Sequence, residues 1–185
     1  MTIRNKAFVA GAFEHPTRLA PDKSTPQLHA ESAAGALADA GLSLADVDAF
    51  FCAGDAPGFG GMSMIDYMGL KVRHVDSTET GGSSYILHVS HAAQAIAAGE
   101  CSVALITLAG RPRSEPFQHM GGGAPEAAFE RWCGVTTHNS YGMCAARHAY
   151  EYGTTPEQLA WIKVAASAHA QHNPHAMLPN LVTVE

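Results

Sequence analysis

The stretch that most constrains the fold covers residues 74–110, because it carries a complete strand, turn, helix and strand pattern. A short polar strand candidate opens it, and a turn at residues 81–84 (GGSS) leads into a helix that Gly99 ends, as a glycine just beyond the last turn does. Four apolar residues recur in that helix at helical spacing: Leu87, Ala93, Ile96 and Ala97. Residues 102–108 (SVALITL) form a continuous apolar run of strand length. The pattern predicts a βαβ unit whose parallel strands are covered by helices on both faces.

The turn in front of this helix is the first candidate for chemistry. Its two glycines, Gly81 and Gly82, permit a sharp turn and a close approach to the backbone. Ser83 and Ser84 follow at the start of the helix, where unpaired N–H groups and a partial positive charge favour an oxyanion or a phosphate. Either serine is a candidate nucleophile, or simply the residue that caps the helix.

The N-terminal part adds further elements of the same kind. Residues 7–13 (AFVAGAF) are expected to form a first strand, and residues 49–53 (AFFCA) a short buried strand. Ser24 or Thr25 caps a helix that has Pro26 in its first turn and ends near Gly41. We expect four residues of this helix to point inward: Leu28, Ala33, Ala34 and Leu37. A glycine-rich loop at residues 54–61 precedes a short helix at residues 62–70 that contributes the core residues Met64, Ile65 and Met68.

The composition of the sequence changes beyond residue 110. Residues 111–141 are a long excursion with prolines, glycines and aromatic residues, and loops of that length are usually functional or disordered. A helix is expected over residues 142–152. A second begins at Pro156, with Thr155 as N-cap and Gln158 completing a capping box, and continues to about Asn173.

Composition excludes several classes of partner. The chain has 185 residues and a formal net charge of −6 without a basic run, which argues against nucleic acid as a partner. No apolar segment has the length of a membrane span, and the apolar run near the start is too short for a signal peptide. The four cysteines have no CxxC spacing, so we expect reduced thiols and a cytoplasmic protein. His169, His172 and His175 recur every third residue, which makes a metal site conceivable, but we expect these histidines to lie on polar faces or near helix ends and expect no metal site.

Four segments together resemble the N-terminal half of the thiolase superfamily, and most closely its sterol-carrier-protein or lipid-transfer type. They are VAGAFEHPTR at 9–18, LADAGLSLADVDAFFCAG at 37–54, SHAAQAIAAGECSVALITLAG at 90–110, and the segment 141–178. The resemblance implies an α/β fold: a thiolase-like βαβαβ half with a mixed, mostly parallel sheet covered by helices, plus an inserted loop region. It also implies a core at residues 1–110, an excursion with two helices at 111–185, and the absence of the C-terminal thiolase half.

Two departures from the family pattern restrict what the resemblance implies. Counting back along the helix, the position of the family's nucleophilic cysteine is occupied here by Gly82, which has no side chain to acylate. Cys52 and Cys101 lie elsewhere and are expected to be small buried residues. A serine at 83 or 84 would need a base to replace the cysteine, so covalent acyl transfer is not expected. Because the family's C-terminal half is missing, we also expect this chain to expose an apolar face that requires a partner to cover it.

The resemblance still implies site residues. Arg111, Arg113 and Arg131 are candidates for holding the phosphates of coenzyme A, against the alternative that they are ordinary surface arginines. His119 and His138 are candidate acids or bases in the loop region. The base of a retro-aldol step is expected to come from the missing half, or from a tyrosine such as Tyr85 or Tyr141. N–H groups near Gly82 and Ser83 are candidates for binding the thioester oxygen.

Three functions remain open from the sequence. The first is a carbon–carbon lyase of the retro-aldol type, or a subunit of one, acting on acyl-CoA, with the coenzyme A thioester as substrate and no covalently bound cofactor. It resembles superfamily members that act in sterol and lipid degradation with an OB-fold partner. The second is an acetyl-CoA acetyltransferase or thiolase. The third is a non-catalytic CoA-binding or structural subunit that completes a partner's active site. We expect an oligomer: a homodimer, or a heteromer with a second thiolase half or an OB-fold subunit.

Overall fold

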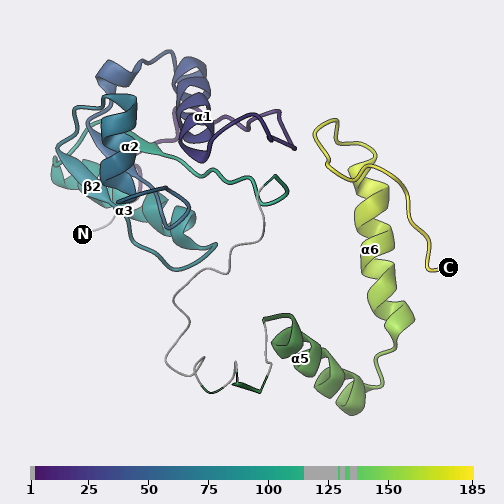
Figure 1. Ribbon diagram of the computed structural model, residues 1–185. Coiled ribbons are helices and arrows are strands. Elements are labelled where there is room, and N and C mark those ends of the chain that lie inside the picture. Colours follow the sequence, from purple (N-terminus) through teal and green to yellow (C-terminus); the bar gives the residue numbers. More distant parts are fainter. Residues whose placement is uncertain (1–2, 115–128, 130–131, 134–136) are drawn as a thin grey trace. The chain divides into compact units, whose positions relative to one another are not determined.

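The computed structural model describes residues 3–114, 129, 132–133 and 137–185 (Figure 1). The chain separates into two compact units, Met1–Pro116 and Phe117–Glu185. The first unit contains a parallel sheet with helices on both of its faces. The regular elements in the described part of the second unit are helices.

The sheet of the first unit is built from three short parallel strands, β1 (Ala49–Phe51), β2 (His74–Asp76) and β3 (Ala104–Ile106). Their order is β2-β1-β3, so β1 is the central strand. Phe51, the last residue of β1, is paired with Asp76 on one side and with Ile106 on the other. The three carboxyl ends therefore lie in register, and the segments that follow them emerge at one edge of the sheet.

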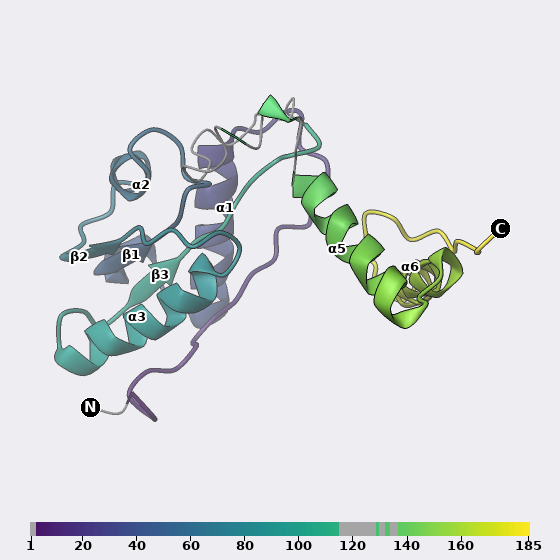
Figure 2. The ribbon, with the colours of Figure 1, turned by 90° about the horizontal axis from the view of Figure 1, so that it is seen from below.

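Successive residues of β1 point to opposite faces of the sheet, and each face is covered by helices. Phe50 and Cys52 pack with residues of α1 (Thr25–Ala40) and α2 (Gly61–Met68), including Leu37 and Met64. Ala49 and Phe51 pack instead against Ala92 and Ala95 of α3 (Ser84–Ala98). Figure 2 shows the strands between α2 and α3. Both phenylalanines are completely buried, and each contributes about 2–3 kcal/mol to stability through the apolar area removed from water.

The amino ends of the strands are tied together by Asp48, immediately before β1. Its carboxylate accepts hydrogen bonds from the backbone N–H groups of Ser102 (2.9 Å) and Val103 (2.8 Å), which precede β3. It also accepts one from Arg73, which precedes β2, at 3.1 Å from Nη2. The hydrogen bonds outweigh burial, which raises the pKa, and hold the pKa of Asp48 below its ordinary value.

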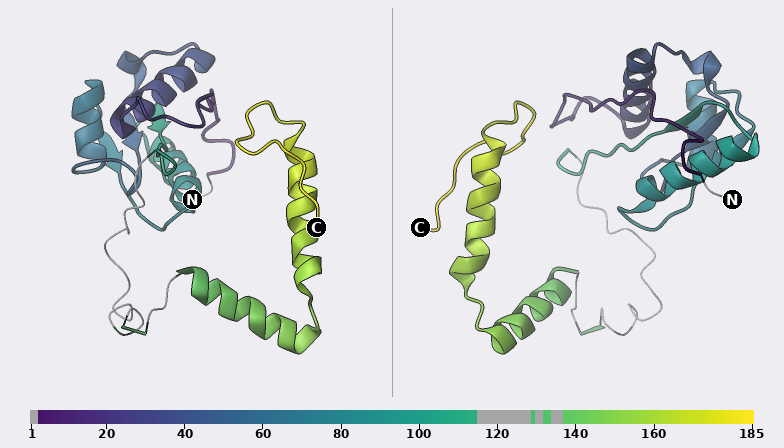
Figure 3. Two further views of the ribbon diagram at one scale, coloured as in Figure 1. Left: turned by 45° about the vertical axis from the view of Figure 1, so that its right-hand side comes forward. Right: turned by 180° about the vertical axis from the view of Figure 1, so that it is seen from behind.

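The second unit contains α5 (Thr137–Tyr152) and α6 (Pro156–Ala170). The segment after α6 turns back alongside it (Figure 3), and Val182 N–H donates a hydrogen bond of 3.1 Å to the hydroxyl of Ser167. Thr155 and Gln158 form the predicted capping box in front of α6. The helix ends at Ala170, a little earlier than predicted, and α5 begins at Thr137, earlier than the predicted residue 142.

The structure confirms the α/β fold, the helix ends at Gly41 and Gly99, and the strands at the centre of the pattern. All three described strands are parallel. The predicted strand at residues 7–13 is wrong: this segment is extended but forms no strand, and its Phe8 side chain is 83% exposed. An apolar segment becomes a strand only where a neighbouring strand takes up its hydrogen bonds, and the described residues provide none. Ala34 is exposed instead of buried; the inward position that the prediction missed is His29.

Candidate functional site

A cluster of polar side chains lies at the carboxyl edge of the sheet, where parallel α/β sheets bind their ligands. Asp55 comes from the loop after β1, Glu79 from the segment after β2, and Thr107 directly follows β3. The amino end of α3 and His29 of α1 complete the cluster. Because the three strands end in register, these side chains meet although they are far apart in the sequence.

Asp55 is at the centre of the cluster. Its Oδ1 accepts a hydrogen bond from the hydroxyl of Tyr85, and its Oδ2 accepts one from the backbone N–H of Ala109 at 2.8 Å. Nε2 of His29 lies 3.2 Å from the same Oδ2, although it is not aligned as a hydrogen bond. Burial raises the pKa of Asp55, but the contacts with His29, Tyr85 and Ala109 outweigh it and hold the pKa below its ordinary value. Asp55 is therefore a carboxylate at neutral pH.

His29 reaches this carboxylate from the middle of α1 and is completely buried. Its Nδ1 lies 2.8 Å from the hydroxyl of Thr107, which is also buried. An imidazole nitrogen that faces a carboxylate is stabilised when it carries the proton, so we assign the proton to Nε2. Nδ1 then accepts a hydrogen bond from the Thr107 hydroxyl, which fixes the ring.

The turn in front of α3 is held by Ser84 and Glu79. Ser84 is completely buried, and its hydroxyl donates a hydrogen bond of 2.6 Å to the carbonyl of Gly81 and accepts one of 2.8 Å from the N–H of Thr80. Glu79 accepts hydrogen bonds from the N–H groups of Gly54 (2.5 Å) and Gly81 (2.6 Å), and these two bonds hold its pKa below the ordinary value. Glu79 thus joins the loop after β1 to the start of α3.

The structure brings four of the predicted site residues together at the amino end of α3. Gly82 is exposed, and a Cβ added there would meet no atom within 4 Å. Ser83 is the N-cap residue by position, but its side chain makes no capping hydrogen bond. Ser84 has its hydroxyl committed to the turn. Tyr85, half-buried, points its hydroxyl to Asp55.

The other predicted site residues lie elsewhere. Nη1 of Arg111 is 3.5 Å from the carbonyl of Ala20, and Arg113 is exposed after β3. His138 is an exposed residue of α5 in the second unit. His119 and Arg131 lie outside the described residues.

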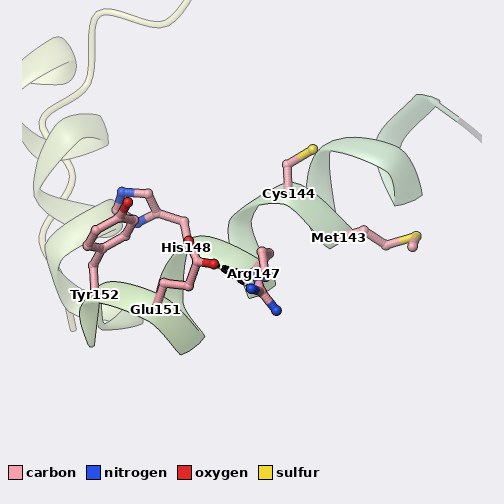
Figure 4. A pocket seen from close by; sticks show the side chains of 6 residues that line it. All are labelled: Met143, Cys144, Arg147, His148, Glu151 and Tyr152. Atoms are coloured by element: carbon pink, nitrogen blue, oxygen red, sulfur yellow. Dashed lines mark hydrogen bonds and ion pairs between the residues drawn. The ribbon is translucent and has the colours of Figure 1, made fainter.

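Two surface recesses occur away from this cluster. One of about 420 Å³ follows a single face of α5, where Arg147 and Glu151 form an ion pair beside His148 and Tyr152 (Figure 4). The other, of about 780 Å³, lies beside β2 and α3 and contains the ion pairs of Asp76 with His91 and of Glu100 with His74. Neither includes the turn in front of α3.

Sequence reasoning found the turn at residues 81–85 but missed Asp55, His29, Thr107 and Glu79. Asp55 carried a usable signal, because it follows a buried strand within a glycine-rich loop. His29 carried none, since a histidine in an amphipathic helix is usually a surface residue. Within the ranges that the structure describes, no group of three or more His, Cys, Asp or Glu side chains is placed to hold a metal ion. None of the described helices is both long enough and apolar enough to span a membrane.

Comparisons with known proteins agree on the class of this fold. No family model matches the sequence. The chain is 31% identical to an acetyl-CoA acetyltransferase of Methanothermobacter thermautotrophicus over 89% of its own length and 45% of that protein. It is 30% identical to a steroid side-chain-cleaving aldolase of Thermomonospora curvata over 83% of its length and 42% of that protein.

A solved structure gives the same result. The chain superimposes on an Ltp2-ChsH2(DUF35) aldolase with a TM-score of 0.75 and 26% identity, covering 94% of this chain and 45% of that one. The fold is therefore that of a thiolase-like α/β protein. The chain is similar to thiolase-like proteins, and the matched ones include acetyl-CoA acetyltransferases and aldolases. It spans less than half the length of the curated relatives it matches.

Proposed function

We propose that this chain forms part of a carbon–carbon lyase that cleaves a β-hydroxyacyl-CoA by a retro-aldol reaction. One observation carries the proposal: the amino end of α3 carries no cysteine. The exposed hydroxyl of Ser83 would need an adjacent base to act as a nucleophile. Gly82 has no side chain, and the hydroxyl of Ser84 is buried and bonded to the Gly81 carbonyl. Cys52 and Cys101 are buried, and burial raises the pKa of both thiols, that of Cys52 to about 11. The aldolases among the relatives support the same reaction class.

A retro-aldol reaction needs no covalent acyl intermediate. A base takes the proton of the β-hydroxyl group, and the bond between Cα and Cβ then breaks. The electron pair moves onto the thioester as an enolate, while Cβ becomes a carbonyl carbon. The enolate finally takes up a proton at Cα. The reaction therefore requires a proton-transfer group and donors that stabilise the enolate oxygen.

The amino end of α3 suits the second requirement. The hydrogen bonds that hold its turn use the N–H groups of Thr80, Gly81 and Ser84. We assign the N–H groups of Gly82 and Ser83 as donors to the thioester oxygen, where the partial positive charge of the helix end also favours an anion. Arg111, Arg113 and Arg131 are proposed to bind the phosphates of coenzyme A. A heteromeric assembly is proposed as well, because one structural relative is a two-component aldolase.

The test is a comparison of two substrates with the protein isolated from its natural source, together with any subunit that accompanies it. We expect cleavage of a β-hydroxyacyl-CoA into a shorter acyl-CoA and a ketone or aldehyde, followed by liquid chromatography and mass spectrometry. We expect no thiolysis of a β-ketoacyl-CoA by free coenzyme A. Thiolysis without cleavage of the hydroxy ester would contradict the proposal and favour an acetyltransferase.

A further inference from the structure

Tyr85 differs from the other groups at the amino end of α3, because its side chain links the helix to the central cluster. It is the second residue of α3 and lies three positions after Gly82. Its ring is edge-on to that of His88, with centroids 5.8 Å apart at 84°, and its hydroxyl donates to Oδ1 of Asp55. The phenol oxygen keeps lone pairs for a second hydrogen bond, which a substrate hydroxyl is able to donate.

Asp55 is held for this contact by groups from two other elements. Ala109 N–H, after β3, donates to Oδ2 at 2.8 Å, and His29 of α1 faces the same oxygen at 3.2 Å. His29 is completely buried, and its Nε2 faces this carboxylate at ion-pair distance without the alignment of a hydrogen bond. The ring therefore holds Oδ2 in place while Oδ1 stays directed to the hydroxyl of Tyr85.

We propose that Tyr85 relays a proton between the substrate and the carboxylate of Asp55, and that His29 and Thr107 are positioning residues for that carboxylate. The inference rests on the proposed lyase function. In the forward step the substrate hydroxyl gives its proton to the Tyr85 oxygen, while the Tyr85 proton passes to Oδ1 of Asp55. After the Cα–Cβ bond breaks, the proton returns from Asp55 to Tyr85, and Tyr85 protonates Cα of the enolate. The proton lost by the hydroxyl is the one gained by Cα, so no co-reactant is needed.

The charges around Tyr85 favour a relay over a permanent phenolate base. Burial, and then the hydrogen bond to Asp55, raise the pKa of Tyr85 well above its ordinary value. Asp55, Glu79 and Cys52 all contribute in this direction, and the neighbouring His88 packs against the ring. Tyr85 therefore remains a phenol at neutral pH and accepts a proton only as it releases its own.

The first experiment measures cleavage of a β-hydroxyacyl-CoA by the natural assembly and its variants. Tyr85→Phe keeps the ring and removes only the hydroxyl. We expect it to lower kcat by about 10²-fold or more with little change in KM. The matched control is Tyr67→Phe, at an exposed tyrosine of α2, which is expected to retain the wild-type kcat. An unchanged kcat in Tyr85→Phe would overturn the relay while leaving the lyase function intact.

A second experiment tests the protonation state of Tyr85 in the absence of substrate turnover. Tyrosine labelled with ¹³C at Cζ reports ionisation by NMR, and Tyr85→Phe assigns the signal. We expect the Tyr85 signal to stay that of a phenol at a pH above the ordinary tyrosine pKa of about 10. Asp55→Asn is expected to lower its midpoint, whereas the control Asp66→Asn is not. Ionisation of Tyr85 at or below that ordinary value overturns the inference. Absence of cleavage by the wild-type assembly instead overturns the proposed function.

Discussion

The buried hydroxyl of Ser84 donates a hydrogen bond of 2.6 Å to the carbonyl of Gly81, so this serine holds the turn in front of α3. Ser84→Ala removes that bond and leaves the Thr80 N–H without its acceptor. We expect a loss of about 1–3 kcal/mol in the free energy of unfolding. Ser83→Ala is the matched control: its side chain is exposed and makes no cap, so we expect a change within about 0.5 kcal/mol. Denaturant unfolding measures both, and equal losses would contradict this role for Ser84.

The four cysteines differ in accessibility, which predicts their reactivity. Cys133 and Cys144 are exposed, whereas Cys52 and Cys101 are buried. Thiol alkylation requires access and the thiolate form, and burial raises the pKa of Cys52 to about 11. We expect iodoacetamide to label two cysteines quickly in the native protein and all four after unfolding, as counted by intact mass. Rapid native labelling of Cys52 would contradict the assignment of this thiol to the core.

Gly82 has room for a side chain, which permits a gain-of-reactivity test. An added Cβ meets nothing within 4 Å, so Gly82→Cys is expected to fold with wild-type stability. The introduced thiol lies at the amino end of α3, where the helix dipole lowers thiol pKa values. We expect it to be alkylated faster than the thiol of Gln94→Cys, an exposed control position in the same helix. Equal alkylation rates would show that this helix end does not activate a group at position 82.

The lowered pKa of Asp76, the last residue of β2, predicts how the stability of the protein depends on pH. Its carboxylate accepts hydrogen bonds from the N–H (2.8 Å) and hydroxyl (2.6 Å) of Thr78 and lies 2.5 Å from Nδ1 of His91. Burial raises the pKa, but these contacts outweigh it and lower the pKa from 3.8 to about 2. A lowered pKa stabilises the folded state above the unfolded pKa, and this stabilisation is lost as the pH falls through the folded pKa.

The corresponding experiment follows the free energy of unfolding as the solution is acidified. We expect Asp76 to contribute about 2 kcal/mol near neutral pH and to lose this contribution between about pH 4 and pH 2. Asp76→Asn is expected to flatten this part of the curve, and Asp66→Asn, at an exposed carboxylate on α2, to leave it unchanged. If the Asp76→Asn variant lost as much free energy of unfolding on acidification as the wild type does, the prediction would be contradicted.

Local signals in the sequence located most of the elements. Gly41 and Gly99 adopt the left-handed conformation that ends α1 and α3, and Thr155 with Gln158 caps α6 as expected. Such signals act over a few residues, so one sequence is enough to read them. The segment 7–13 shows the limit, because strand formation depends on a partner elsewhere; its Val9 side chain remains 80% exposed.

The candidate site was predictable only in part for the same reason. The turn at residues 81–85 is continuous in sequence, whereas the cluster joins His29, Asp55 and Thr107 from three separate elements. Only the in-register ends of parallel strands bring these residues together. The exact partner of the Tyr85 hydroxyl therefore required the structure, although the glycine at position 82 already pointed away from a covalent intermediate.

We propose that catalysis at the start of α3 proceeds without a covalent acyl-enzyme. The most direct measurement is the intact mass of this chain during turnover of a β-hydroxyacyl-CoA by the natural assembly, quenched in acid at successive times. We expect shorter acyl-CoA and carbonyl product to accumulate while the chain keeps its unmodified mass. An acyl adduct that appears and decays at the rate of turnover, mapped to Ser83, Ser84 or a cysteine, would contradict it.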